Sequence, residues 1–247
     1  MIPKVIHYCW FGGNPLPEDA KRCIASWRRY MPDYEIKEWN ETNFDVHVNT
    51  YCSQAYEAKK YAFVSDYARL WVLYNYGGVY FDTDVEVIKP LSNILQKGAY
   101  MGCETSPTEK RPIITVNPGL GFAIDARHAI LKELLDNYDQ RTFIKDDGKL
   151  DQKTIVATTT EILLKHGLEC INGIQDIEGI TIYPKEYFCP IGINGDEQIT
   201  TNTYTIHHFA QSWRSPFHVW LRTVILTICG WRFKSLLSRI FQYIRKS

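Results

Sequence analysis

Two aspartates, Asp82 and Asp84, lie one residue apart in the stretch NYGGVYFDTDVEV, residues 75–87. We predict a β-strand here, and residues two apart on a strand share one face, so both carboxylates would point the same way. Carboxylates that close repel each other unless a cation lies between them. Their oxygens suit a hard divalent ion, Mn²⁺ or Mg²⁺, which often takes phosphate oxygens as further ligands. The stretch therefore indicates either a divalent-metal site or a solvated strand end with two incidental acids.

A second pair of charged residues, Asp66 and Arg69, lies in a helix predicted over roughly residues 53–75 and ended by Gly77-Gly78. Residues three apart on a helix are neighbours, so these side chains can form an ion pair. Arginine also suits planar contacts to phosphate. The pair either ties the helix to the sheet or presents polar groups at the same sheet edge as the two aspartates.

Two adjacent histidines, His207 and His208, lie in the stretch YTIHHFAQSW, residues 204–213. Neighbours on a strand face opposite ways, so at most one of them can line a site. An imidazole is a suitable further ligand for Mn²⁺ beside Asp84. We favour His207 and keep His208 as the alternative, while the pair could also be one core and one surface residue.

The expected elements begin with a strand over 4–10, a helix over 18–30 and a strand over 34–40. This spacing predicts a βαβ unit with a parallel sheet. Helix patterns follow at 127–138 and 151–167. Further strands are expected at 99–104, 119–124, 180–184 and 203–209. The fold class is therefore α/β.

The charge of the chain is unevenly distributed along its 247 residues, although the formal net charge is +0. Residues 214–247 hold 7 Lys and Arg and no acid, which leaves 21 basic against 28 acidic residues before residue 214. A basic segment beside an acidic body indicates an anionic partner surface. We therefore divide the chain into a domain over 1–213 and a basic tail over 214–247.

An amphipathic helix is predicted in this tail, because its apolar residues recur three and four apart: Phe233, Leu236, Leu237, Ile240, Phe241 and Ile244. An apolar stripe beside a basic face is typical of a helix lying at an anionic membrane surface. The stripe could instead dock on the acidic body. We expect the membrane surface as the partner, and no nucleic acid.

The compartment is predicted from the seven scattered cysteines, which show no CxxC pair and are typical of reduced cytosolic thiols. The chain starts with no signal-peptide pattern and has no run of 18 apolar residues. We expect a cytoplasmic protein, peripheral to the inner face of the cell membrane.

Three stretches, IPKVIHYCWFGG, FVSDYARLWVLYNYGGVYFDTDVEV and YTIHHFAQSW, together resemble the sugar-transferring DxD glycosyltransferases of family 32. That family includes capsular-polysaccharide enzymes and α-mannosyl- and α-galactosyltransferases. The chain is more distantly similar to the catalytic domain of the large glucosylating toxins. The resemblance covers residues 2–90 and 204–213, and its most specific part is the string S-D-x-x-R-x(7)-G-G-x-Y-x-D-x-D.

The resemblance implies a type A glycosyltransferase fold, with a Rossmann-like mixed sheet flanked by helices and a nucleotide-sugar over the carboxyl ends of the strands. It implies that Trp10 stacks on the nucleobase, unless this tryptophan belongs to the core. Asp66 and Arg69 then hold the donor sugar and Tyr80 lies beside the metal motif. In that motif Asp84 binds the ion and Asp82 reaches ribose or sugar.

The resemblance also implies that Ser212 and Trp213 close over the diphosphate and that Asn117 lies near the transferred sugar. Asn117 could equally belong to a simple Pro-Gly turn. Many family members start the next helix with a Gly-Pro pair, whereas the matching region here reads TIVATTTEIL. This departure from the family pattern falls in the region that the resemblance assigns to the acceptor, so the resemblance does not extend to acceptor binding.

We therefore expect a metal-dependent, retaining glycosyltransferase that moves a sugar from a UDP- or GDP-linked donor to a polysaccharide, such as a capsule, or to a lipid-linked oligosaccharide. One alternative is an aspartyl-phosphatase-like hydrolase with Asp82 as nucleophile, because an apolar strand ending in DxD also fits that class. A second alternative is a membrane-peripheral scaffold without activity.

Overall fold

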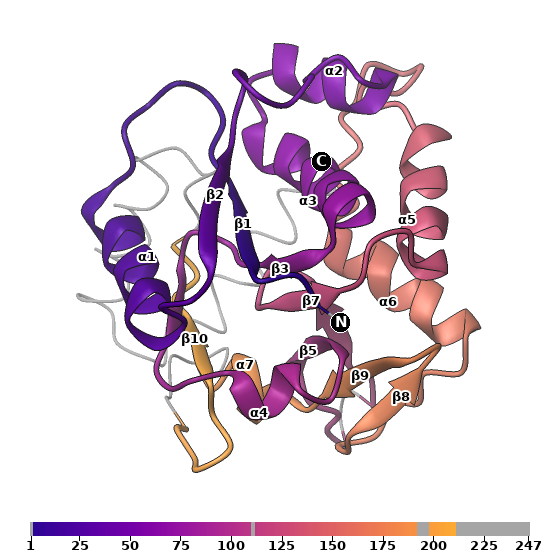
Figure 1. Ribbon diagram of the computed structural model, residues 1–247. Coiled ribbons are helices and arrows are strands. Elements are labelled where there is room, and N and C mark those ends of the chain that lie inside the picture. Colours follow the sequence, from indigo (N-terminus) through magenta and orange to yellow (C-terminus); the bar gives the residue numbers. More distant parts are fainter. Residues whose placement is uncertain (1, 110–111, 192–197, 211–247) are drawn as a thin grey trace, which may run out of the picture. The chain divides into compact units, whose positions relative to one another are not determined.

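A mixed β-sheet forms the centre of the protein in the computed structural model, which describes residues 2–109, 112–191 and 198–210 (Figure 1). The strands follow the order β2-β1-β3-β7-β5-β9-β8, with β6 paired to β5. β1 is parallel to β2 and β3, and β5 is parallel to β9, whereas β7 runs antiparallel to both β3 and β5. The bounds are β1 Val5–Cys9, β2 Glu35–Trp39, β3 Gly78–Tyr80, β5 Ala99–Thr105, β6 Thr115–Asn117, β7 Phe122–Ile124, β8 Gln175–Ile177 and β9 Ile180–Tyr183.

A separate two-stranded sheet pairs β4 (Val85–Val87) antiparallel with β10 (Thr205–His207). It lies against α1 (Glu18–Tyr30), because the buried indole N–H of Trp27 donates to the carbonyl of Val85 at 2.7 Å. The predicted βαβ unit is confirmed by β1, α1 and β2. The register of β4 with β10 brings two segments together that are 120 residues apart in the sequence.

The helix predicted over 53–75 is wrong in its extent, because the structure has two helices, α2 (Thr50–Glu57) and α3 (Tyr61–Tyr76). Between them Lys59 adopts a left-handed conformation with φ 56. No glycine or proline marks this break, so the helical pattern runs through it. Burial explains the break, since α2 and α3 each bury a face of their own and a straight helix would expose one of them.

The predicted helices over 127–138 and 151–167 are confirmed as α5 (Ala129–Asp139) and α6 (Ile155–Lys165), the latter starting four residues later than expected. Thr154 sets that start, since its side chain accepts the N–H of Ala157. The short helices α4 (Ser92–Leu95) and α7 (Lys185–Phe188) and the strands β6 and β8 were not predicted.

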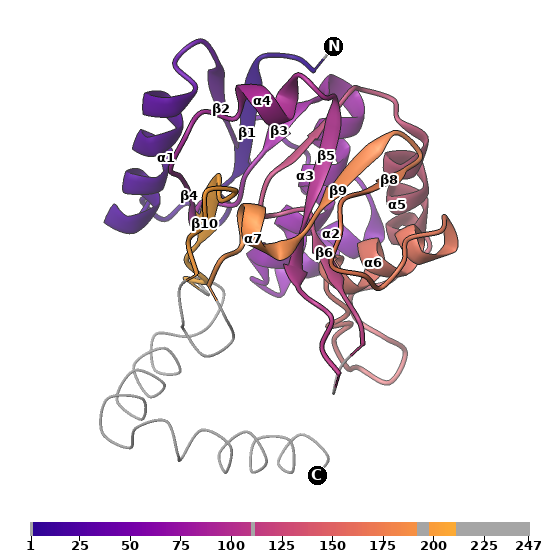
Figure 2. The ribbon, with the colours of Figure 1, turned by 90° about the horizontal axis from the view of Figure 1, so that it is seen from below.

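Helices cover both faces of the sheet, as Figure 2 shows in a second view. One apolar core lies under α2, α3, α5 and α6, and a second lies under α1, α4 and α7. The predicted tail over 214–247 lies outside the described residues. Among the residues that are described, no helix combines the length and apolar character needed to cross a bilayer.

His7 connects β1, β2 and the glycine turn that begins β3. Its Nδ1 accepts the indole N–H of Trp39 at 3.1 Å, and its Nε2–H donates to the carbonyl of Gly77 at 2.9 Å. Gly77 and Gly78 have φ of 63 and 105, and a Cβ on Gly78 would lie 2.8 Å from the carbonyl of Val5. Burial lowers the pKa of His7 to about 4. The neutral imidazole therefore helps to place β3, and with it the two aspartates that follow.

We expect the free energy of unfolding to fall as the pH drops from about 6.5 towards 4. In this range His7 takes up a proton in the unfolded state and stays neutral in the folded state. Protonation therefore stabilises the unfolded state relative to the folded state by roughly 3 kcal/mol. Urea unfolding at several pH values measures the slope in the wild type and in His7→Gln, which cannot titrate. Equal slopes in the two proteins would contradict this explanation.

Candidate active site

The two aspartates lie in a turn rather than on a strand, because β3 ends at Tyr80 and β4 begins at Val85. The N–H of Val85 donates to the carbonyl of Asp82 at 3.0 Å and closes the turn. The expectation that Asp82 and Asp84 lie on a strand and share one of its faces is therefore wrong. The turn nevertheless brings their carboxylates together, at the sheet edge where the parallel strands β1 and β3 end.

His207 completes a group of three potential metal ligands with these aspartates. One ligand atom from each of Asp82, Asp84 and His207 lies within 4.8 Å of the other two. The Nε2 of His207 is 3.1 Å from Oδ1 of Asp84. The pairing of β10 with β4 produces this contact, since it sets His207 opposite Val85, the residue after Asp84.

His208, the other candidate ligand, is not brought to the aspartates. Its Nε2 lies 2.9 Å from Oε2 of Glu86, and both side chains are 43% exposed. Its backbone N–H donates to the carbonyl of Asp84 at 3.0 Å. The two histidines thus face opposite ways, and only His207 contributes its ring to the group.

Asp82, Asp84 and His207 fit a divalent ion such as Mn²⁺, because two carboxylates and an imidazole are a suitable donor set for it. Burial by itself lowers the pKa of His207, but its hydrogen bond to Asp84 and the charge of that carboxylate raise the pKa to about 10. The protonated ring thus balances charge on the carboxylates beside it. An ion that binds His207 has to displace this proton.

Arg69 connects the helix α3 to the turn that carries the aspartates. Its Nη2 lies 3.1 Å from Oδ1 of Asp66 and 3.1 Å from Oδ1 of Asp82, and its Nη1 donates to Oδ2 of Asp82 at 3.3 Å. The side chain is only 6% exposed. The pair with Asp66 therefore does both things that the sequence left open: it ties helix to sheet and lies beside the aspartates.

Asp66 is the most buried carboxylate of this group. Burial raises its pKa to about 6, and the charge of Arg69 opposes that rise. Because one guanidinium serves two carboxylates, Asp66 is only partly neutralised. A ligand with hydroxyl donors would find an acceptor in this carboxylate.

Tyr80 and Cys9 lie next to Arg69 and Asp82. The hydroxyl of Tyr80 donates to Oδ1 of Asp82 at 3.2 Å, and its ring lies under the guanidinium of Arg69 at 4.8 Å. Cys9 ends β1 next to this ring, and burial raises the pKa of its thiol to about 12. Burial also raises the pKa of Tyr80, so Arg69 is the charged member of these three side chains.

Gly119 is a site residue that the sequence analysis did not single out as such. Its carbonyl accepts the N–H of Asp82 at 2.9 Å. A Cβ at this position would lie 1.9 Å from Oδ2 of Asp82 and 2.9 Å from Nη1 of Arg69. The signal in the sequence is the turn NPG, residues 117–119, in which only glycine leaves room for this approach.

Asn117 holds that turn in place. Its Oδ1 accepts the N–H of Gly119 at 2.7 Å, and its Nδ2 donates to Oε2 of Glu104 at 2.7 Å. Both ends of the carboxamide are thus engaged within the protein. Asn117 is brought close to the aspartates through Gly119, and the half-buried Glu104 on β5 is a carboxylate of this region that the sequence did not indicate.

Trp10 directly follows β1 at the same sheet edge. Its indole N–H donates to the carbonyl of Asn14 at 2.6 Å, and the residue is half-buried. It therefore borders the second core without being enclosed in it. Ser212 and Trp213, the residues expected to close over a diphosphate, lie outside the described residues.

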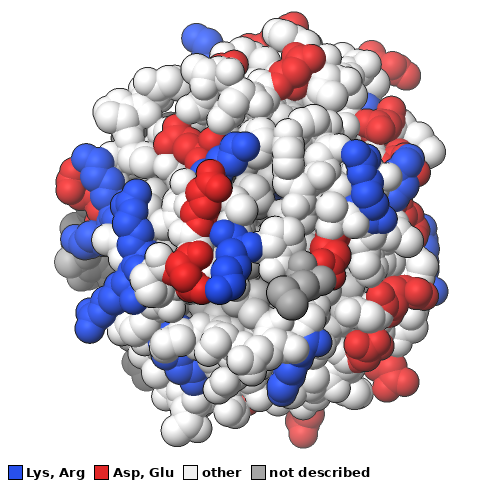
Figure 3. All heavy atoms as spheres, viewed as in Figure 1, with Lys and Arg blue, Asp and Glu red and all other residues white. Residues whose placement is uncertain are grey.

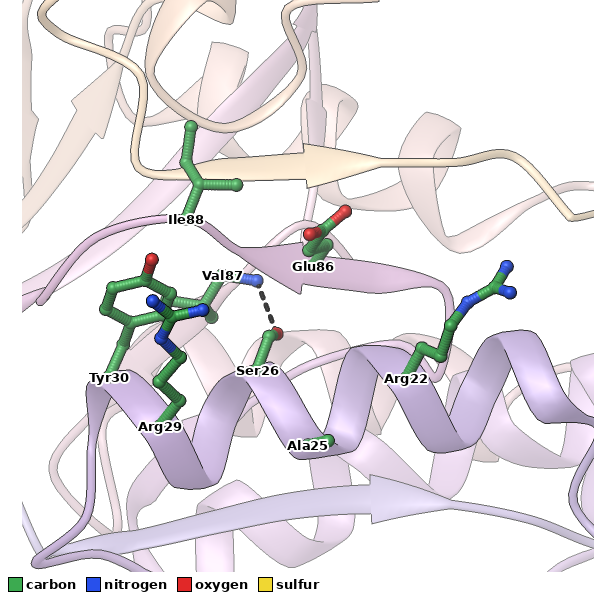
Figure 4. A pocket seen from close by; sticks show the side chains of 8 residues that line it. All are labelled: Arg22, Ala25, Ser26, Arg29, Tyr30, Glu86, Val87 and Ile88. Atoms are coloured by element: carbon green, nitrogen blue, oxygen red, sulfur yellow. Dashed lines mark hydrogen bonds between the residues drawn. The ribbon is translucent and has the colours of Figure 1, made fainter.

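A shallow groove between α1 and β4 contains none of the predicted site residues (Figure 4). Arg22, Arg29 and Glu86 line it, and a hydrogen bond from the N–H of Val87 to Ser26 crosses it. Figure 3 shows Lys and Arg side chains gathered where Figure 1 draws α1. Arg22 pairs with the exposed Asp19, and Glu86 hydrogen-bonds with His208.

The mixed sheet flanked by helices, with paired aspartates at the edge where β1 and β3 end, is the type A glycosyltransferase fold. A crystal structure of a glycosyltransferase involved in the glycosylation of the major capsid of PBCV-1 shares this fold with a TM-score of 0.50. The two chains are 10% identical, and the match covers 83% of this chain and 93% of the other. Residues 17–100 match the family described as the glycosyltransferase sugar-binding region containing the DXD motif.

Two curated relatives come from Schizosaccharomyces pombe. Inositol phosphoceramide mannosyltransferase 1 is 32% identical over 43% of this chain, and inositol phosphoceramide mannosyltransferase 3 is 29% identical over 58% of it. The matches span 35% and 38% of the lengths of these relatives. The similarity therefore concerns a part of each relative and supports the resemblance seen in the sequence.

We expect His207→Ala to weaken Mn²⁺ binding by about tenfold or more, because the variant loses one of three converging ligands. The adjacent His208→Ala is the matched control and should change the affinity less than twofold. Calorimetric titration of the purified proteins with MnCl₂ measures both. A larger loss in His208→Ala than in His207→Ala would reverse the assignment.

Proposed function

We propose that the chain is a metal-dependent glycosyltransferase that takes a sugar from a UDP- or GDP-sugar. The observation that carries this proposal is the convergence of Asp82, Asp84 and His207 beside the Arg69–Asp66 pair. A divalent ion in this group would neutralise charge on the departing diphosphate. The family match over residues 17–100 supports the same reaction class.

Each residue of the site has a proposed task in that reaction. Asp84 and His207 hold the ion, and Asp82 shares it or reaches the ribose or sugar. Arg69 keeps Asp82 oriented through two contacts and supplies positive charge where negative charge develops. Asp66 accepts hydroxyl groups of the donor sugar, since its carboxylate is only partly neutralised by Arg69.

The nucleotide is proposed to lie over the end of β1. The half-buried indole of Trp10 offers a flat, rigid surface on which a nucleobase can stack. Tyr80 supports Asp82 from below with its hydroxyl. Ser212 and Trp213 are proposed to close over the diphosphate on the basis of the sequence resemblance alone.

The reaction is proposed to retain the anomeric configuration, as the resemblance to family 32 implies. Asp66 and Asp82 both accept hydrogen bonds from Arg69, and Asp82 also accepts one from Tyr80. Carboxylates held in this way are poor nucleophiles, so a same-face transfer is the simpler mechanism. The same contacts disfavour a phosphatase in which Asp82 attacks phosphate. NMR of the product, which reads the anomeric configuration, tests retention.

The proposed acceptor is a polysaccharide, such as a capsule, or a lipid-linked oligosaccharide. The two relatives are named for transfer of mannose to inositol phosphoceramide, which supports a lipid-linked acceptor. Their names also make GDP-mannose a donor to test early.

Mn²⁺-dependent release of free nucleotide from a panel of UDP- and GDP-sugars tests the proposal. We expect Asp84→Ala to lower this release at least about a hundredfold, because the ion loses a direct ligand. Asp136→Ala, which changes an exposed carboxylate of α5, is the control, and thermal melting shows that both variants fold. No release from any donor would favour the inactive scaffold, and a covalent phosphate on Asp82 would favour the phosphatase.

A basic segment over 214–247 supports a further proposal, that the protein lies peripherally at the inner face of the cell membrane. We expect the full-length chain to float with anionic vesicles at low salt and to stay unbound with neutral ones. A chain that ends at Pro216 should bind neither kind. Equal flotation of the two proteins with anionic vesicles would contradict the proposal that the tail binds the membrane.

A further inference from the structure

Glu104 is the extra residue of a bulge in β5, close to the end of that strand. Cys103 pairs with Val116 of β6, and the next pair is Thr105 with Thr115. Two steps along β5 thus correspond to one step along β6, and Glu104 has no opposite residue. A bulge changes the direction of a side chain and is common beside active sites. Because β7 is antiparallel to both β3 and β5, β5 ends at the same edge of the sheet as β3.

The carboxamide of Asn117 has one orientation between two neighbours. Its Nδ2 donates to Oε2 of Glu104 at 2.7 Å, and its Oδ1 accepts the N–H of Gly119 at 2.7 Å. A carboxylate only accepts hydrogen bonds and a backbone N–H only donates them, so both neighbours require the same orientation. Asn117 is 6% exposed, and a rotated carboxamide would leave buried polar groups without partners. Glu104 therefore keeps the oxygen of Asn117 directed at Gly119.

Gly119 connects this carboxamide to Asp82. The carbonyl of Gly119 accepts the N–H of Asp82 at 2.9 Å. The glycine also lies so close to the carboxylate that an added Cβ would be 1.9 Å from Oδ2 of Asp82 and 2.9 Å from Nη1 of Arg69. A shift of Gly119 towards Asp82 would produce a clash, and a shift away would lengthen the backbone hydrogen bond. The position of Gly119 thus limits where the carboxylate of Asp82 can point.

Longer contacts hold the residue that follows Gly119. The N–H of Leu120 donates to the carbonyl of Asn117 at 3.3 Å, and the carbonyl of Leu120 accepts the hydroxyl of Thr205 at 3.4 Å. Both distances exceed the usual range for such hydrogen bonds. The two contacts of the Asn117 carboxamide are much shorter, so the turn depends mainly on them.

We propose that Glu104 is a positioning residue of this site, which holds the Asn117 carboxamide and, through Gly119, orients the carboxylate of Asp82. The inference rests on the proposed function in one respect, namely that Asp82 meets the metal ion. Glu104 acts here by accepting a hydrogen bond and not by its charge. A neutral side chain that still accepts this bond should therefore replace it.

A matched pair of variants separates the hydrogen bond from the charge. Glu104→Gln and Glu104→Met both remove the negative charge and keep a similar length, but only glutamine offers an oxygen to Asn117. We expect Glu104→Met to bind Mn²⁺ about tenfold more weakly than the wild type, as is typical when a metal ligand loses its outer support. Glu104→Gln should stay within about threefold of the wild type, because a charge that does not touch the ion contributes little. Calorimetric titration with MnCl₂ measures both affinities, and thermal melting shows that both variants fold.

Hydrogen exchange of the Gly119 amide, followed by NMR on protein with ¹⁵N-glycine, tests Glu104 without metal or substrate. We expect this exchange to be at least about tenfold faster in Glu104→Met than in Glu104→Gln, because only the methionine variant releases the carboxamide that accepts the N–H. The amide of Gly179 is the internal control. It donates to Oδ1 of Asp176 at 3.1 Å in the turn between β8 and β9, and its exchange should be the same in both variants.

Equal Mn²⁺ affinities in Glu104→Gln and Glu104→Met overturn the inference, and so does equal exchange of the Gly119 amide. If Glu104→Met fails to fold, Glu104→Ala takes its place in both measurements. If the wild-type protein turns over no nucleotide-sugar, the proposed function fails, while Mn²⁺ binding and amide exchange still decide the role of Glu104.

Discussion

The site depends on the ion pairs that the buried guanidinium of Arg69 forms with two carboxylates. The arginine side chain is 6% exposed and lies between Asp66 on α3 and Asp82 in the turn after β3. Removing one member of a buried charge group leaves its partners without compensation, which is strongly destabilising. The three side chains therefore fix α3 relative to the sheet edge and bring charged groups to one place. Arg69 therefore has a structural task as well as its proposed catalytic one, since its contact with Asp82 joins α3 to the turn after β3 and also orients Asp82.

Close backbone contacts allow this charge group to exist in so little space. Gly119 lies against Asp82 and Arg69 where a Cβ would come within 1.9 Å of a carboxylate oxygen. Gly77 and Gly78 adopt left-handed conformations between α3 and β3, beside the buried ring of His7. Glycine is the residue that permits such conformations and approaches. The site thus requires glycines at its edges as much as it requires charged side chains at its centre.

Elements distant in the sequence provide the remaining parts of the site. The strand β10 contributes His207 by pairing with β4, and the hydroxyl of Thr160 on α6 accepts the N–H of Val116 on β6, the residue before Asn117. Arg141 connects α6 to α2 and α5 through two buried tyrosines. Buried polar contacts of α6 therefore reach the strand that leads to Asn117. Arg141 and Asp151, which pack against the start of α6, show no recognisable pattern in the sequence.

The sequence by itself determined the βαβ start, the end of α3 at Gly77, the ion pair of Asp66 with Arg69 and the family resemblance, because these depend on local spacing and on one specific string. Only the tertiary structure decided that His207 rather than His208 lies beside Asp84, because that choice depends on the register of β10 with β4. It also replaced the expected strand through Asp82 and Asp84 with a turn, and one expected helix with α2 and α3. The approach of Gly119 to Asp82 joins residues 37 positions apart, and local patterns contain no information about such contacts.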